Sequence, residues 1–387
     1  MRAGAFLYPW DVVGDAEAPG RVAALGVRSV TLAAAYHSTR ALTPRHPRHR
    51  VVTAGHAAVL YPPGDRWADR ALAPCPAGDW ARGDAYGEAA AALAQAGLEV
   101  HSWVVLAHNS RLGAEHPDTS VVNAYGDRYP WAPCIAQPAT RAYLVDLAAE
   151  AAVRPGAHGT ELESLGWYGL AHLHAHDKTS GVALGDAGQY LMSLCFCPSC
   201  RAGYGEHGLD GDRLAHTVRA ALEPVWRGAP EGEGWTGVEK LLGESTAWAT
   251  RAWREDRART LQEAAVAAVR ATAPDGFRVL LHADPVWYHC GANAGVDPAH
   301  ILSVADGVVV PCTGGAGPLV PFAGQGGPDA VLAANLTVVS GMGGRPDTLA
   351  ADAARARDLG ATKLRLYHAG LASDADLTAV REALGRM

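Results

Sequence analysis

One junction near the end of the chain reads Ala350-Ala-Asp-Ala-Ala-Arg-Ala-Arg-Asp-Leu-Gly360 and continues as Ala361-Thr-Lys-Leu-Arg-Leu-Tyr367. The first part is rich in alanine and arginine, which favour a helix, and it ends in glycine, a residue that commonly follows a helix C-terminus. The second part alternates apolar and polar residues, which is typical of a strand. A helix that runs directly into a strand is one half of a parallel α/β repeat.

This alternation of strand and helix patterns recurs along the whole chain. Strands are expected at residues 3–8, 28–33, 99–106, 160–166, 277–283, 307–311, 334–340 and 361–367. Helices are expected at residues 19–25, 86–96, 139–152, 246–272, 298–304, 347–359 and 374–387. Eight such units in one chain predict a (β/α)8, or TIM, barrel of the α/β class. A doubly wound sheet is the alternative, but no glycine-rich phosphate loop follows the first strand.

The length of the chain leaves room for additions to such a barrel. The chain has 387 residues, whereas a barrel of this type needs about 250. The surplus falls after the second, third and fourth strands, at about 36–83, 107–138 and 167–245. We therefore expect one barrel domain over residues 1–387, with all three insertions at the C-terminal face, where such barrels place their active sites.

Composition narrows the classes of partner. The net charge is −7, and the lack of an extended basic patch argues against nucleic acid. The one basic run, residues 44–50, is interpreted as a solvated loop. The N-terminus lacks the apolar run of a signal peptide, and no stretch approaches the roughly 18 apolar residues of a membrane span. We expect a cytoplasmic protein that binds no membrane, and we leave open whether it forms a homo-oligomer.

The most specific chemical signal is Leu194-Cys-Phe-Cys-Pro-Ser-Cys-Arg201, with three thiols in six residues. Thiolates bind Zn²⁺ tetrahedrally, and a structural site takes four protein ligands. Cys134, just before a predicted helix, is the candidate for the fourth ligand. Reduced, unliganded thiols are the alternative, and a disulfide framework is disfavoured in a long chain without a secretory leader. We expect a structural zinc held by Cys134, Cys195, Cys197 and Cys200.

Two carboxylates alternate along the fourth predicted strand. Glu161 and Glu163 share one face, and a carboxylate inside a barrel is costly unless it is paired or functional. Glu163, nearer the strand end, is the candidate general acid or base, and Glu161 is interpreted as structural. Both would instead be surface residues if the strand were at an edge. Asp284, at the end of the fifth strand, is the second catalytic candidate, or a turn residue before Pro285.

Polar and aromatic side chains gather at the predicted C-terminal ends of at least six strands. Histidines at 172, 174 and 176 alternate, which suits either a second metal or contacts with substrate hydroxyls. Together the strand ends describe a pocket suited to a polyol. The residues expected to bind substrate are Trp10, Tyr36, His37, Arg40, His101, His108, Asn109, His172, His174, His176, Lys178, His282, Trp287 and Tyr367.

The stretch from Cys134 to about residue 204 resembles the family 42 β-galactosidases. Its matching elements are Trp131-Ala-Pro-Cys134, then Glu163, then Cys195-Phe-Cys-Pro-Ser-Cys-Arg201. The resemblance implies a (β/α)8 glycosidase in which an upstream cysteine and the C-x-C-x-x-C cluster form a structural zinc site. It also implies that the glutamate ending strand four is the acid/base. The match covers roughly a fifth of the chain.

Two departures from that family bear on the mechanism. The family has Asn-Glu at the end of strand four, whereas this chain has Leu162-Glu163, and the predicted seventh strand lacks the family's nucleophilic glutamate. We therefore expect a glycosidase-like enzyme that acts on a small carbohydrate without the usual retaining mechanism. A sugar lyase, epimerase or isomerase that uses Glu163 and the pocket histidines is the alternative, as is a non-catalytic sugar-binding barrel.

Overall fold

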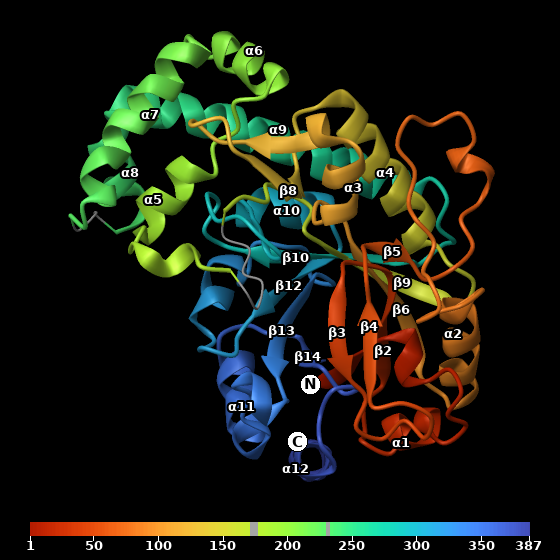
Figure 1. Cartoon of the computed structure of the whole chain (residues 1–387). Helices are drawn as coiled ribbons and strands as arrows, with labels where there is room; N and C mark the ends of the chain where they lie inside the picture. The colour runs from red at the N-terminus through yellow and green to blue at the C-terminus, as the bar shows by residue number, and fades with distance from the viewer. Residues whose placement is uncertain (171–176, 230–232) are drawn as a thin grey trace.

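Eight parallel strands close into a barrel in the computed structural model, which describes residues 1–170, 177–229 and 233–387 (Figure 1). The strand order is β1-β14-β13-β12-β10-β9-β6-β2, and β2 pairs with β1 to close the ring. The barrel strands are β1 (Arg2–Leu7), β2 (Ser29–Tyr36), β6 (Glu99–Val105), β9 (Ala157–Glu163), β10 (Arg278–Asp284), β12 (Gly307–Pro311), β13 (Val331–Thr337) and β14 (Lys363–Tyr367). The predicted TIM barrel is confirmed.

The strand boundaries differ from the prediction most at β9 and β13, which each begin three residues earlier than expected. Pairing with neighbours on both sides extends β9, since Gly159 pairs with His101 of β6 and with Arg278 of β10. The earlier end of β13 brings Thr337, and not Ser340, to the rim of the barrel.

Helices surround the barrel. They are α1 (Ala18–Ala23), α2 (Ala85–Gln95), α4 (Pro138–Ala152), α9 (Glu244–Arg270), α10 (Pro298–Val304), α11 (Leu349–Asp358) and α12 (Asp374–Gly385). Several begin with a side-chain cap: Asp84 accepts from the Gly87 N–H before α2, and Ser373 accepts from the Asp376 N–H before α12. Such caps satisfy amide groups that have no partner inside the helix.

Additional elements follow the strands whose exits carry the predicted insertions. After β2 come β3 (Thr39–Leu42), β4 (Val51–Ala54) and β5 (Ala58–Val59); after β6 come α3 (Ser110–Glu115), β7 (Ser120–Val122) and β8 (Arg128–Pro133); after β9 come α5 (Gly185–Met192), α6 (Pro198–Glu206), α7 (Gly211–Trp226) and α8 (Gly234–Leu242). A short strand, β11 (Ala294–Gly295), pairs with β10. In Figure 1 the elements α5–α8 form a green group beside the barrel.

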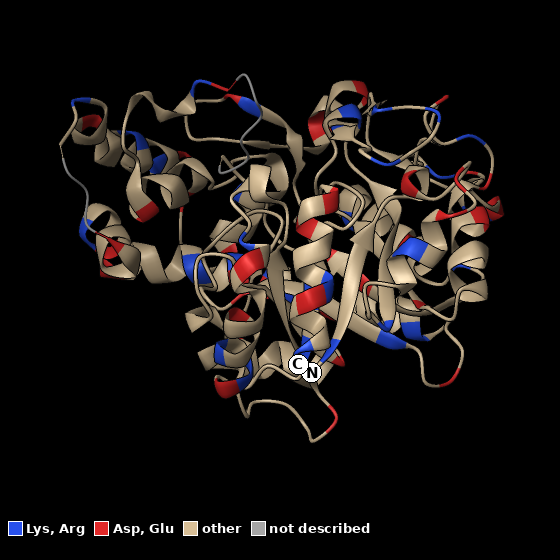
Figure 2. Cartoon of the chain, turned by 90° about the horizontal axis from the view of Figure 1, so that it is seen from below, with Lys and Arg blue, Asp and Glu red and all other residues tan. Residues whose placement is uncertain are grey.

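Seven 3-10 turns complete the described elements: η1 (Pro9–Asp11), η2 (Asp65–Trp67), η3 (Pro117–Thr119), η4 (Thr179–Gly181), η5 (Gly317–Phe322), η6 (Ser340–Met342) and η7 (Pro346–Thr348). Basic and acidic side chains are interspersed over the ribbon (Figure 2). Of the helices that the structure describes, none has the length and apolar character needed to cross a bilayer.

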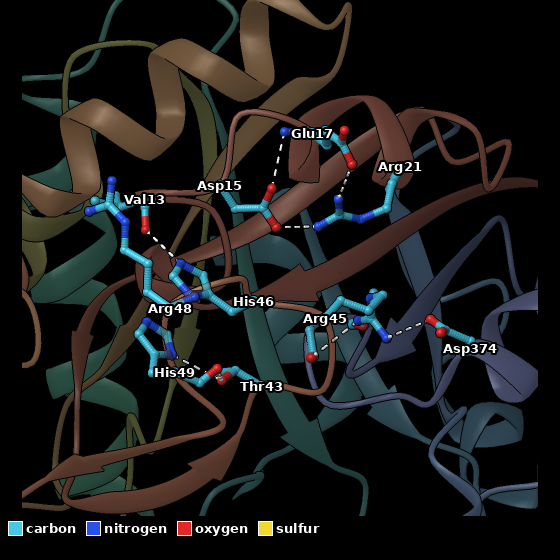
Figure 3. A network of polar contacts seen from close by, with 12 residues as sticks. Val13, Asp15, Glu17, Arg21, Thr43, Arg45, His46, Arg48, His49 and Asp374 are labelled. Atoms are coloured by element: carbon cyan, nitrogen blue, oxygen red, sulfur yellow. Dashed lines mark hydrogen bonds and ion pairs between the residues drawn. The ribbon is translucent and has the colours of Figure 1, made fainter.

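The basic run at residues 44–50 is partly buried and makes polar contacts, in contrast to the solvated loop that the sequence suggested (Figure 3). Arg45 donates to the carbonyl oxygens of Ala369 (2.7 Å) and Gly370 (3.2 Å), just after β14. His46 is buried, and its Nε2 lies 3.0 Å from the carbonyl oxygen of Val13. These contacts attach the basic run to the loops after β1 and β14. They also give hydrogen-bond partners to backbone carbonyl groups that lie outside helices and strands.

Candidate active site at the mouth of the barrel

Glu163 ends β9 with its side chain directed into the mouth of the barrel. The indole N–H of Trp103 donates to Glu163 Oε2 at 2.8 Å, and His282 Nδ1 lies 3.8 Å from the same oxygen. The residue is only 8% exposed. Burial raises the pKa of Glu163, while His282 and the Trp103 hydrogen bond oppose that rise. A carboxyl group that keeps its proton nearer neutral pH than usual is suited to proton transfer.

Glu161 lies two residues deeper on the same face and is fully buried. Its Oε1 accepts from the Arg365 Nε and, at 3.0 Å, from the Thr31 hydroxyl. His282 Nε2 is 3.4 Å from Oε2, without hydrogen-bond alignment. Burial alone would raise the pKa of Glu161, but Arg365 and then His282 lower it to about 2. The carboxylate is therefore ionised and held inside the barrel.

Aromatic rings form the wall around Glu163. The Tyr8 hydroxyl donates to the Tyr36 hydroxyl at 3.0 Å, and Tyr36 packs edge-on against Trp103 with ring centroids 4.6 Å apart. Tyr168 stacks on His108 at 4.6 Å. Burial raises the pKa of the Tyr36 phenol, followed by the charges of Tyr367, Tyr8 and Glu163, so the ring stays neutral. Neutral phenols and imidazoles can exchange hydrogen bonds with sugar hydroxyls.

These residues enclose a cavity of about 630 Å³, which suits a small ligand. The predicted site residues that line it are Tyr36, His37, Arg40, His108, Glu163, His282 and Tyr367. They come from the exits of β2, β6, β9, β10 and β14. The ends of the barrel strands were expected to bring such residues together, and these seven residues do lie around one cavity.

Other predicted residues lie elsewhere. Trp10 is buried and stacked on Tyr8, with ring centroids 4.5 Å apart, and is not among the residues that line the cavity. His101 points toward the start of its strand, and its Nε2 lies 2.7 Å from Glu99 Oε1. Asn109 caps α3 by accepting from the Leu112 N–H at 2.9 Å. Lys178 is exposed just before η4. His172, His174 and His176 fall outside the described residues.

Asp284 borders a second cavity of about 400 Å³, which adjoins the first at Tyr168 and Asn293. Its Oδ1 accepts from the Val286 N–H at 2.8 Å, which is the turn role that the sequence left open. Its Oδ2 lies 2.9 Å from His289 Nδ1, and this contact, the largest cause, raises the pKa of His289. Trp287 packs against Trp235, with ring centroids 4.7 Å apart, outside both linings.

Several lining residues were absent from the sequence-based set. They are Tyr8, Trp103, Tyr168, Asn293, Thr313, Asn335 and Thr337. Trp103 and Tyr8 had a usable signal, because both stand at inward or terminal positions of strands that already carried candidates. Asn335 and Thr337 had no such signal. The seventh strand was predicted to run over residues 334–340, so both residues were expected inside the strand and not near its end.

The four predicted metal ligands come together away from this cavity. Their sulfur atoms lie within 4.8 Å of one another and all four residues are buried. Cys134 Sγ is 3.7 Å from Cys197 Sγ and 3.6 Å from Cys200 Sγ. Four sulfurs around a tetrahedral ion at 2.3 Å would be about 3.8 Å apart. The residues thus fit a tetrahedral metal ion, and none of the four forms a disulfide.

The cysteine cluster joins two segments that leave neighbouring strands. Cys134 follows β8, whereas Cys195, Cys197 and Cys200 stand at or just before the start of α6. Around them, the Phe196 N–H donates to the Val122 carbonyl at 2.7 Å, and the Tyr129 hydroxyl donates to the Met192 carbonyl at 2.8 Å. Hydrogen bonds from Cys134, Cys195 and Cys200 lower the pKa of Cys197, which favours a thiolate there.

No protein-family model matches the chain, and no curated protein matches it in sequence. Solved structures do match. The glycoside hydrolase domain of PgaB (BpsB) from Bordetella bronchiseptica is 16% identical over 99% of both chains, with a TM-score of 0.56. The chain shares the (β/α)8 barrel fold of this domain. Identity this low shows the fold alone.

Two further matches extend this result. The α-L-fucosidase isoenzyme 2 from Paenibacillus thiaminolyticus matches all of this chain with 12% identity and a TM-score of 0.57. The structure of a catalytic mutant of Gan42B, a GH42 β-galactosidase from G. stearothermophilus, matches this chain with 10% identity and a TM-score of 0.57. The chain spans 49% of the fucosidase chain and 56% of the galactosidase chain. At the level of fold, the resemblance to family 42 is confirmed.

Proposed function

We propose that the protein is a glycoside hydrolase-like enzyme that acts on a small carbohydrate or glycoside, with Glu163 as the general acid or base. The observation that carries this proposal is the raised pKa of a nearly buried Glu163 in an aromatic-walled cavity at the barrel mouth. Proton transfer from such a group to a glycosidic oxygen assists departure of the leaving sugar. Glycoside hydrolases among the structural neighbours support the same chemistry.

The second proposed catalytic group, Asp284, lies outside the lining of the Glu163 cavity. Among the described lining residues, Glu163 is the sole carboxylate of its cavity, and β13 contributes Asn335 and Thr337 where a retaining enzyme would need a nucleophile. Asp284, in the adjoining cavity, remains our proposed base for water or stabiliser of the oxocarbenium-like transition state. We propose inversion in preference to a covalent intermediate, because Asp284 lines the adjoining cavity and β13 offers no carboxylate there.

One observation favours a different reaction class. A lone carboxylate surrounded by His37, His108 and His282 can move a proton on and off a sugar carbon as well as hydrolyse a bond. A lyase, epimerase or isomerase is therefore the second candidate, and a barrel that binds sugar without turnover is the third. Mass spectrometry separates them, because hydrolysis adds water, elimination splits the substrate without water, and isomerisation leaves the mass unchanged.

A panel of aryl glycosides and free sugars, incubated with the full chain, tests the proposal. We expect turnover of at least one member by the protein, its loss in Glu163→Gln, and no change in Glu88→Gln, a control on the exposed face of α2. Binding without turnover would contradict the enzymatic proposal. Turnover that survives Glu163→Gln would contradict the assignment of Glu163.

The metal in the cysteine cluster is proposed to be a structural zinc. Four thiolate ligands leave no open position, so the ion would stabilise the fold and take no part in the reaction. Elemental analysis of protein purified without chelator should give one zinc per chain. Cys197→Ser should remove the zinc and lower thermal stability, because binding energy at such a site is folding energy. Cys75→Ser, outside the cluster, should leave both unchanged. Protein without stoichiometric zinc would refute this assignment.

A further inference from the structure

A third cavity, of about 200 Å³, adjoins the Glu163 cavity at the exits of β12 and β13. The two cavities share Thr313 and Thr337 in their linings. The Thr313 hydroxyl donates to the Thr337 hydroxyl at 2.9 Å and accepts from the Thr337 N–H at 3.0 Å. A ligand that fills the larger cavity can therefore extend one substituent past this threonine pair. We call the smaller space the threonine-gated cavity.

The charges around the threonine-gated cavity favour an anion. Its lining includes Arg345, Arg355 and one carboxylate, Asp352. Asp352 is already compensated, since it accepts from the Thr348 hydroxyl at 2.6 Å and pairs with Arg355. Within the part of the chain that the structure describes, no hydrogen bond or ion pair occupies the Arg345 guanidinium. Arg345 is exposed, so its guanidinium is open to solvent and available to a ligand.

A glycine-rich loop forms another wall of this cavity. Gly315 has a φ of +140°, a conformation that side chains disfavour. At Gly314 the φ is ordinary, and a Cβ there would meet no atom within 4 Å, so open space lies beside the backbone. Gly314 therefore lacks a side chain although packing does not require glycine at that position. The backbone of this loop and the Thr313 hydroxyl are open to close approach by a ligand.

We propose that the threonine-gated cavity is a subsite for an anionic substituent of the substrate sugar, namely a phosphate, sulfate or carboxylate group. Arg345 binds its oxygens through the planar donor fork that suits such groups, and Thr313 and the glycine loop contact it from the other side. This subsite would serve the proposed function, and the description of its ligand as a substrate rests on that function. The anion site itself can be tested without any turnover.

Binding of inorganic phosphate, sulfate and glucuronate to the full chain is the first test, measured by calorimetry at constant ionic strength. We expect at least one of the three to bind, and Arg345→Gln to weaken that binding by about tenfold or more, as loss of a charge-assisted hydrogen bond does. Arg357→Gln is the matched control, because Arg357 is on the same helix as Arg355 but outside the lining.

Three outcomes overturn the proposal: no binding of any probe, no effect of Arg345→Gln, or equal weakening by the Arg357→Gln control. Gly314→Val provides a second variant, since its side chain would occupy the open space and should also weaken binding. The tetrahedral probes and glucuronate distinguish a phosphate or sulfate group from a carboxylate.

A second arm connects the subsite to the reaction. The ratio of kcat/KM for an anionic glycoside to that for its neutral counterpart should fall about tenfold in Arg345→Gln and stay constant in Arg357→Gln. If no glycoside is turned over at all, the proposed hydrolase function fails while the result of the binding test stands. If glycosides are turned over with no preference for the anionic one, the subsite fails and the hydrolase remains.

Discussion

Glu161 and Glu163 are two residues apart on β9, face the same interior and are both buried, yet their pKa values move in opposite directions. The deeper carboxylate has Arg365 and Thr31 as partners, so its charge is held. Glu163, nearer the cavity, has the indole N–H of Trp103 and the more distant imidazole of His282 as partners, so the effect of burial on its pKa prevails. The partners of a barrel carboxylate, and not its depth alone, therefore decide whether it serves structure or chemistry.

The largest expected effect tests the lower layer. Glu161→Gln should lower the free energy of unfolding by about 3–5 kcal/mol, because it leaves the buried Arg365 without its counter-charge. Chemical denaturation of the variant, with Glu88→Gln as the exposed control, measures this difference. A loss below 1 kcal/mol would show that the two layers do not differ as described.

The pH dependence of stability sharpens the same point. The pKa of Glu161 falls from 4.5 to about 2 in the folded protein, which corresponds to on the order of 3 kcal/mol. Because the folded pKa is the lower one, this stabilisation is present above about pH 4.5 and is lost as the pH falls toward 2. The stability gap between the protein and Glu161→Gln should therefore narrow across that window. A gap that stays constant would contradict the ion pair.

The upper layer should respond in rate and not in stability. Glu163→Gln should reduce kcat at least about 100-fold, equivalent to about 2.7 kcal/mol of activation free energy, because an amide cannot transfer the proton. Its unfolding transition should stay close to that of the unmodified protein. Comparison of both quantities for Glu161→Gln and Glu163→Gln gives a direct contrast, and a variant pair that behaves alike would break it.

The smallest effect concerns the partner of Glu163. Trp103→Phe removes the N–H that favours the ionised form, so the pKa of Glu163 should rise further. If Glu163 is a general acid, the alkaline limb of the pH–rate profile should move upward by roughly one pH unit. If it is a general base, the acidic limb should move instead. Trp226→Phe, at an exposed tryptophan of α7, serves as the control, and a profile that stays fixed would exclude the contact from catalysis.

Much of this arrangement was predictable because local pattern and global fold agree. Alternation along each strand and glycine at the α11–β14 junction suffice to count eight units. The face shared by Glu161 and Glu163 follows from the same period of two. The cysteine spacing predicted a cluster that the structure brings within metal-binding distance.

The remainder depends on contacts that no local pattern carries. Arg365 compensates Glu161 across the barrel, 204 residues away in sequence. Asp284 shares a strand face with His282, but its Oδ1 accepts from the Val286 N–H and its Oδ2 contacts His289, and it lines the neighbouring cavity. Trp287 was expected to bind substrate, but its ring packs against Trp235 and Arg251. Tertiary partners decided each of these cases.

The closure of the ring has a consequence for how the protein is made. β1, the first barrel strand along the sequence, pairs with β14, the last barrel strand, while β13 also has β14 as its neighbour. A nascent chain that has not yet emerged as far as Lys363 therefore presents two open sheet edges, on β1 and β13, and such edges are sites of unwanted pairing between chains. Since synthesis proceeds from the N-terminus, β1 stays unpaired on that side until the other seven barrel strands have been made. Pairing with β14 covers this edge, so completion of the barrel removes the site for pairing between chains.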